Sequence, residues 1–129
     1  MISQAIDAQK KLAPSTEQSL PAIITIHSFT PVYFGEERSV ELGMLHDKDD
    51  RLAKAMMTIA KQETRLVAEF NSPYDVSDNV MHTVNRHANE AGFLNVMIEV
   101  KNNLLLNTKD INNMATSLSS IINKSLVNI

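Results

Sequence analysis

Hydrophobic and polar positions along the chain alternate between helical spacing and short apolar runs. The helical spacing predicts helices over residues 2–12, from 50 to about 64, over 79–91 and from 108 to about 126. The β-rich apolar runs predict strands over residues 22–26, 66–70 and 93–100. Residues 28–50 break both patterns, which predicts a long functional loop with one short strand over 40–45.

Strands that alternate with helices in this way indicate crossover connections. They predict one α/β domain over residues 1–129, with a mostly parallel sheet and flanking helices. Asp49 or Asp50 is expected to cap the second helix, and Gly92 to end the third. Three short buried strands make a small sheet, so we expect further strands to complete it.

Composition narrows the class of protein. With 43% hydrophobic and 21% charged residues, the chain has the composition of an ordinary globular domain. Twelve basic against fifteen acidic residues, with no basic stripe, argue against nucleic acid as a partner. The absence of Cys excludes disulfides and thiolate zinc sites and suits the cytoplasm. No signal peptide and no apolar run of 18 residues are found, so we expect neither export nor a membrane partner.

Two polar residues stand where ligands bind in parallel sheets, at the carboxyl ends of predicted strands. His27 ends the first strand, either as a metal ligand or as a hydrogen-bonded histidine at the sheet rim. Glu99 interrupts an apolar strand, where an ionised carboxylate is costly and a raised pKa suits a general base. The alternative for Glu99 is a salt bridge to Lys101, Arg38 or Arg86.

Other combinations of side chains are weaker candidates for a metal site. His87 and Glu90 would share one face of the third helix, whereas His82 and His87 diverge around it. A loose site would need His46, Asp47 and Asp49, but a solvated acidic helix start explains the same residues. The chain contains no nucleophile elbow, Walker loop or dinucleotide-binding glycine motif, which argues against those enzyme classes.

Three segments stand out: IHSFTPVY at 26–33, HTVNRHA at 82–88 and IEVKNNL at 98–104. Together they resemble the N-formylglutamate amidohydrolase family. The similarity extends from about residue 22 to 106, in the family's order and spacing. The family is itself similar to zinc carboxypeptidases, so the resemblance implies a phosphorylase/hydrolase-like, zinc-peptidase-like fold.

The resemblance also implies roles for individual residues. His27 takes the position of a zinc ligand, and Glu99 that of the base that deprotonates the zinc-bound water. The implied substrate is a small N-acyl amino acid such as N-formylglutamate, which is cleaved to glutamate and formate. Arg38, Arg86 and His87 are candidates for binding its carboxylates. Lys101 stands where the family more often has Arg, so we do not count it as a carboxylate clamp.

Members of the family carry an N-terminal half that completes the metal site and has no counterpart in this sequence. Catalytic zinc normally needs three protein ligands, and His27 supplies one. We therefore expect a truncated form with weak or absent zinc binding and no activity in isolation. The alternatives are a non-catalytic α/β module that docks or self-associates through an open sheet edge, or one part of a split enzyme that needs a complementary N-terminal half.

Overall fold

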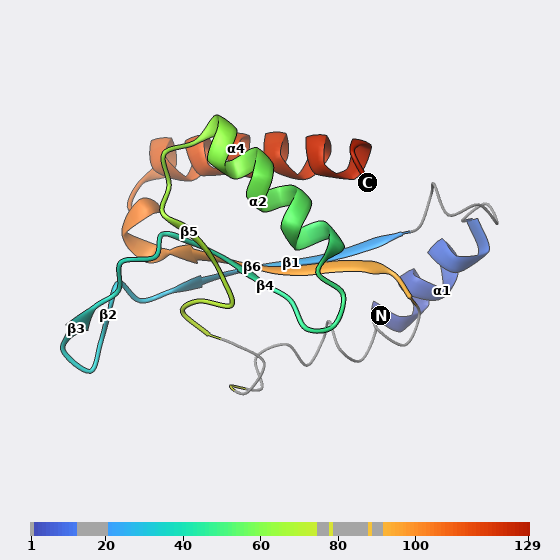
Figure 1. Ribbon diagram of the computed structural model, residues 1–129, viewed down its shortest axis with the longest axis horizontal. Coiled ribbons are helices and arrows are strands. Elements are labelled where there is room, and N and C mark those ends of the chain that lie inside the picture. Colours follow the sequence, from blue (N-terminus) through green and yellow to red (C-terminus); the bar gives the residue numbers. More distant parts are fainter. Residues whose placement is uncertain (1, 13–20, 75–77, 79–87, 89–91) are drawn as a thin grey trace.

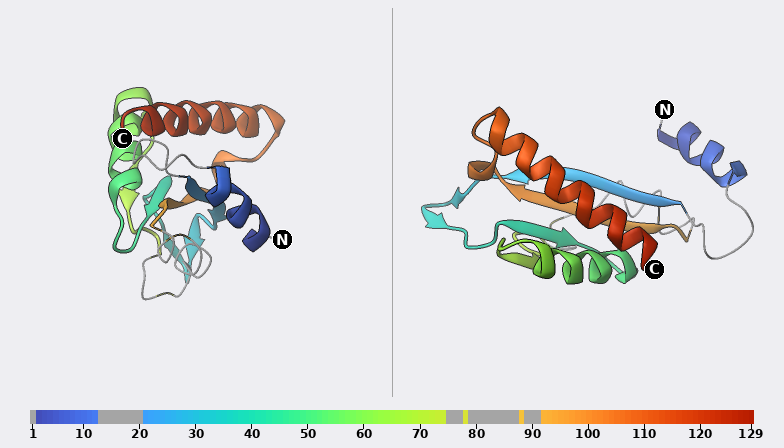
Figure 2. Two further views of the ribbon diagram at one scale, coloured as in Figure 1. Left: turned by 90° about the vertical axis from the view of Figure 1, so that its right-hand side faces the viewer. Right: turned by 90° about the horizontal axis from the view of Figure 1, so that it is seen from above.

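The computed structural model describes residues 2–12, 21–74, 78, 88 and 92–129. In this part of the chain a four-stranded sheet carries helices α2 (Arg51–Glu63) and α4 (Thr108–Val127) on one face (Figure 1). The two helices pack against each other as well as against the sheet (Figure 2). The protein is thus an α/β structure, as the alternation of helices and strands predicts.

The sheet has the order β1–β6–β4–β5, with two of its three pairings parallel. Its strands are β1 (Ala22–Phe29), β4 (Leu42–Leu45), β5 (Ala68–Phe70) and β6 (Leu94–Lys101). The third pairing, between β4 and β6, is antiparallel. This pairing places the segment that follows β1 beside the end of β6.

The segment expected to be a long loop is more regular than its sequence indicates. Strand β1 continues through Phe29 because its register with β6 runs on to Lys101. A hairpin of β2 (Val32–Tyr33) and β3 (Glu36–Glu37) follows, and only then β4. Its turn uses Phe34 and Gly35 with positive φ angles of 49° and 83°, as two-residue hairpin turns require.

The other predicted elements have mixed outcomes. Helix α1 (Ile2–Leu12) and helix α4 match their predictions, and β5 is two residues shorter than predicted. Asp50 is the N-cap of α2, but its side chain makes no capping hydrogen bond and instead pairs with Lys54 at 2.6 Å. Apart from Ala88, the residues of the helix predicted over 79–91 lie outside the described residues. No helix in the described ranges is long and apolar enough to cross a membrane.

Strand β6 is the centre of the core, and its eight residues are all buried. Because side chains alternate between the faces of a strand, Leu94, Val96, Ile98 and Val100 contact the α2 and α4 layer. Asn95, Met97, Glu99 and Lys101 point to the other face, where Met97 packs in a smaller apolar cluster with Leu45, Phe93 and Ala88. The candidate base therefore lies on the face away from the two helices.

Candidate functional site

The structure brings His27 and Glu99 together. They are register partners in the parallel ladder of β1 and β6, near the carboxyl ends of both strands. Register partners on neighbouring strands point to the same face, with their backbones about 4.8 Å apart. The His27 side chain is exposed, whereas the Glu99 residue is only 4% exposed. A solvent-accessible imidazole thus lies beside a buried carboxylate.

Gly43 borders Glu99 on its other side. It is the register partner of Glu99 in β4 and is itself buried. A Cβ atom at Gly43 would lie 2.1 Å from the carbonyl oxygen of Ser72 and 3.2 Å from the Cβ of Glu99. The absence of a side chain at Gly43 therefore allows the Ser72 carbonyl to approach the sheet next to Glu99.

The environment of Glu99 favours its neutral form. Burial raises the pKa of the Glu99 carboxyl, while the nearby charges of His27 and Arg38 act in the opposite direction. Its Oε2 atom is buried and has no hydrogen-bond partner among the described residues. The described residues also show no ion pair to Glu99, so the alternative of a salt bridge to Arg38 or Lys101 is not observed. A buried carboxyl with a raised pKa and an uncommitted oxygen can accept and release a proton.

Arg38 lies at the same end of the sheet, among aromatic rings. Its Cζ is 4.5 Å from the ring centroid of Tyr33, 5.0 Å from that of Tyr74 and 5.6 Å from that of Phe29. Its Nη1 donates to the Thr30 carbonyl oxygen at 3.3 Å and to the Tyr74 hydroxyl at 3.4 Å. No carboxylate in the described residues forms an ion pair with Arg38. This guanidinium is held in place by aromatic rings, a main-chain carbonyl and a hydroxyl group.

The remaining predicted residues are not brought to this site by the described structure. Arg86 and His87, with the alternatives His82 and Glu90, lie outside the described residues. Nδ1 of His46 donates to the Asp47 carbonyl oxygen at 3.0 Å, and its ring meets that of Phe70 edge to face. Within the described ranges, no three His, Asp or Glu residues are grouped so as to hold a metal ion.

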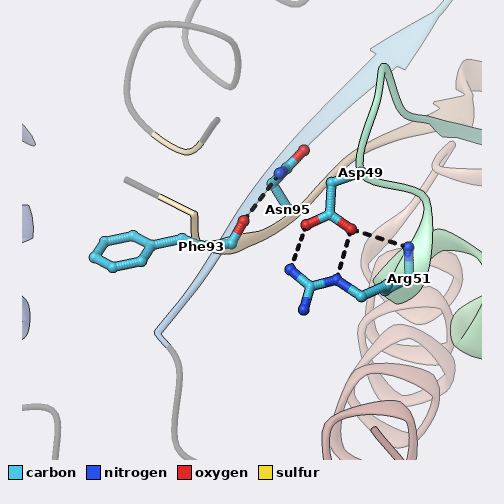
Figure 3. Close-up of polar contacts among 4 residues, drawn as sticks. All are labelled: Asp49, Arg51, Phe93 and Asn95. Atoms are coloured by element: carbon cyan, nitrogen blue, oxygen red, sulfur yellow. Dashed lines mark hydrogen bonds and ion pairs between the residues drawn. The ribbon is translucent and has the colours of Figure 1, made fainter. Parts of the chain in front are cut away.

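Asp49 forms an ion pair with Arg51 at the opposite end of β6. Its carboxylate accepts from Nε and Nη2 of Arg51, at 2.9 and 2.7 Å, and these hydrogen bonds lower the pKa of Asp49 (Figure 3). Nearby, Nδ2 of Asn95 donates to the Phe93 carbonyl oxygen at 3.0 Å. A hollow of about 430 Å³ adjoins this pair and is lined by Lys48, Asp49, Asp50, Arg51, Gly92 and Phe93. It lies at the amino end of β6, away from Glu99.

The described residues supply only part of what a zinc site requires. His27 offers an accessible imidazole, and Glu99 a base next to it in register. A catalytic zinc needs two further protein ligands, which would have to come from outside the described residues.

Sequence reasoning missed three contributors to this end of the sheet: Gly43, Tyr33 and Tyr74. Gly43 had a local signal, because a glycine inside an apolar strand marks close approach of another backbone. The two tyrosines had none: Tyr33 belongs to the hairpin that precedes Arg38, where nothing in the sequence marks their contact, and Tyr74 reaches Arg38 from 36 residues away.

Comparison with known proteins finds a similar crystal structure. No protein-family profile and no curated protein match the chain. The crystal structure of gene product Atu2144 from Agrobacterium tumefaciens is similar over 98% of this chain, with 39% sequence identity and a TM-score of 0.89. The match covers 48% of the Atu2144 chain, so the present chain spans about half the length of that protein.

Proposed function

We propose that this chain is the C-terminal part of an N-formylglutamate amidohydrolase-like, zinc-peptidase-like hydrolase that cleaves a formyl or acyl amide bond. The observation that carries the proposal is the register pairing of exposed His27 with buried Glu99, whose pKa is raised and whose Oε2 is uncommitted. The resemblance of three sequence segments to that family supports it, and so does the similarity to a protein about twice as long.

In this proposal each residue has a defined task. His27 is one zinc ligand, and the remaining ligands come from outside the described residues. Bound zinc would acidify a water molecule and polarise the amide oxygen. Glu99 accepts the proton of the attacking water and delivers it to the leaving amine. Arg38, together with Arg86 and His87, binds the carboxylates of the N-acyl amino acid.

The test is a chimera in which the portion of Atu2144 that this chain does not match is fused to it. We expect zinc near one equivalent per chain, by elemental analysis, and release of formate from N-formyl-L-glutamate. His27→Ala should lose both, whereas Glu99→Gln should keep the metal and lose turnover. Glu69→Gln, at an exposed residue of β5, is the matched control and should change neither. Full turnover by the Glu99→Gln chimera would exclude the proposed base.

A second candidate is a non-catalytic module that docks through the edge of its sheet. In the described part of the chain β1 pairs on one side only, with β6, and Ile26 of β1 is 56% exposed. Exposed edges of this kind accept further strands. Self-association that rises with concentration and is removed by Ile26→Lys, without zinc or turnover in the chimera, would favour this function.

A further inference from the structure

Lys101 is a buried cation beside Arg38. The residue is 7% exposed, and its Nζ donates a hydrogen bond to the main-chain carbonyl oxygen of Arg38. Within the described ranges it forms no ion pair with a carboxylate, although Glu99 lies two residues away on the same face. Burying an ammonium group without a counter-charge is costly. Arg38 and Lys101 thus lie together at one end of the sheet, and neither forms an ion pair within the described residues.

Arg38 is fixed at both its backbone and its side chain. Lys101 holds its carbonyl oxygen, and the Tyr74 hydroxyl accepts from its Nη1 at 3.4 Å. The rings of Tyr33 and Tyr74 both lie within cation–π distance of its Cζ. A guanidinium has five N–H donors, and these contacts use only Nη1. Its Nε and Nη2 edge has no partner among the described residues and matches a carboxylate.

A groove at this position gives a ligand access to Arg38. Its volume is about 440 Å³, and Tyr33, Arg38, Ser39 and Tyr74 belong to its lining. Glu37 and Asp78 also line it, and Arg38 is the one basic residue among its described lining residues. The groove is large enough for a ligand of metabolite size.

We propose that Tyr74 and Lys101 are positioning residues that hold Arg38 as a preorganised receptor for the side-chain carboxylate of an acidic amino acid derivative. Tyr74 sets the plane of the guanidinium, and Lys101 sets the backbone from which it extends. The ligand class rests on the proposed function, in which Arg38 binds a substrate carboxylate. The positioning roles deepen that function, because neither residue would touch the reacting atoms.

Intrinsic fluorescence tests this directly on the metal-free chain. The chain has two tyrosines and no tryptophan, and both tyrosines stack on Arg38, so all its tyrosine emission reports on this site. Glutarate should produce a saturable change in emission. Glutaramide, which has the same carbon skeleton without charge, should not.

Substitutions separate positioning from folding. Arg38→Lys keeps the positive charge but loses the planar pair of N–H donors that matches a carboxylate, and it should weaken glutarate binding by about tenfold. Tyr74→Leu should weaken it by about threefold to tenfold, whereas Tyr74→Phe keeps the ring and should lose less. Lys101→Met should weaken binding by about tenfold, through loss of the charged hydrogen bond. The thermal unfolding midpoint of Lys101→Met without ligand should be unchanged or higher, because a buried charge is removed. If Lys101 only stabilised the fold, the same substitution would lower this midpoint.

The binding experiments test the roles of Tyr74 and Lys101 independently of the proposed hydrolysis. Saturable glutarate binding that depends on Tyr74 and Lys101 supports the receptor, even if the chimera releases no formate. Equal affinity of wild type, Tyr74→Leu and Lys101→Met overturns the positioning roles, even if the chimera is active. The absence of a saturable response to glutarate, or an equal response to glutaramide, overturns the proposed carboxylate receptor. If Tyr74→Leu fails to fold, the comparison of Tyr74→Phe and Lys101→Met with wild type still decides.

Discussion

Replacing Glu99 by Gln should stabilise the folded chain at neutral pH. Glu99 is 4% exposed, and its Oε2 has no hydrogen-bond partner among the described residues. Gln has nearly the same shape but carries no charge that must lose its hydration on folding. Removal of an incompletely compensated buried charge in this way should raise the free energy of unfolding by about 1–2 kcal/mol. We take the low end of the general range because His27 and Arg38 partly offset the cost of burial.

The pH dependence gives the sign of the effect. Burial raises the pKa of Glu99 above its usual value of 4.5, so the folded chain binds the proton more tightly than the unfolded chain. This contribution to stability is fully present below the unfolded pKa and is lost as the pH rises through the folded pKa. Wild type and Glu99→Gln should therefore differ little at about pH 4 and most at neutral pH or above.

Thermal unfolding followed by circular dichroism measures both effects. For a chain of 129 residues, an unfolding entropy of about 2.1 cal/mol/K per residue converts the expected gain to a midpoint about 4–7 °C higher. The reasoning is refuted if Glu99→Gln is less stable at pH 7, or if its difference from wild type is the same at pH 4 and pH 7. The first result would show that the carboxylate is paired in the folded chain, and the second that folding does not shift its pKa.

Glu63→Gln is a control of opposite sign. Hydrogen bonds from Lys124 and Ser120 lower the pKa of Glu63. Its stabilising contribution is therefore present above the unfolded pKa and is lost as the pH falls through the folded pKa. Glu63→Gln should lower the unfolding midpoint at pH 7 and have less effect at pH 4.

Three further substitutions test the packing around the site. Gly43→Ala should lower the free energy of unfolding by at least about 1–3 kcal/mol in urea titrations, because the new Cβ meets the Ser72 carbonyl; an unchanged midpoint would contradict this close approach. Asn107→Ala should cost about 1 kcal/mol in the same assay, since its side chain caps α4; Asn112→Ala, inside that helix, is the control and should cost much less. Met56→Ala, at a fully buried position in α2, should cost about 2–5 kcal/mol by thermal unfolding, and a loss below 1 kcal/mol would argue against a tight contact of α2 with the sheet.

The candidate pair could be identified from the sequence because its signals are local. A polar residue at the end of an apolar run predicts a side chain at the rim of the sheet, and this applied to both His27 and Glu99. The prediction of the residues that surround Glu99 was less accurate. Its apolar neighbours Ile98 and Val100 lie on the opposite face of β6, and on its own face it has Met97 and Lys101.

The sequence by itself determined the helices α1, α2 and α4, the central strand β6 and the α/β class, because hydrophobic periodicity depends only on neighbouring positions. Only the tertiary structure decided the antiparallel direction of β4, the register that joins His27 to Glu99, and the position of the chain at Ser72 over Gly43. It also decided that Lys101 holds the backbone of Arg38. Strand direction and register arise from pairing between distant segments, which no local pattern encodes.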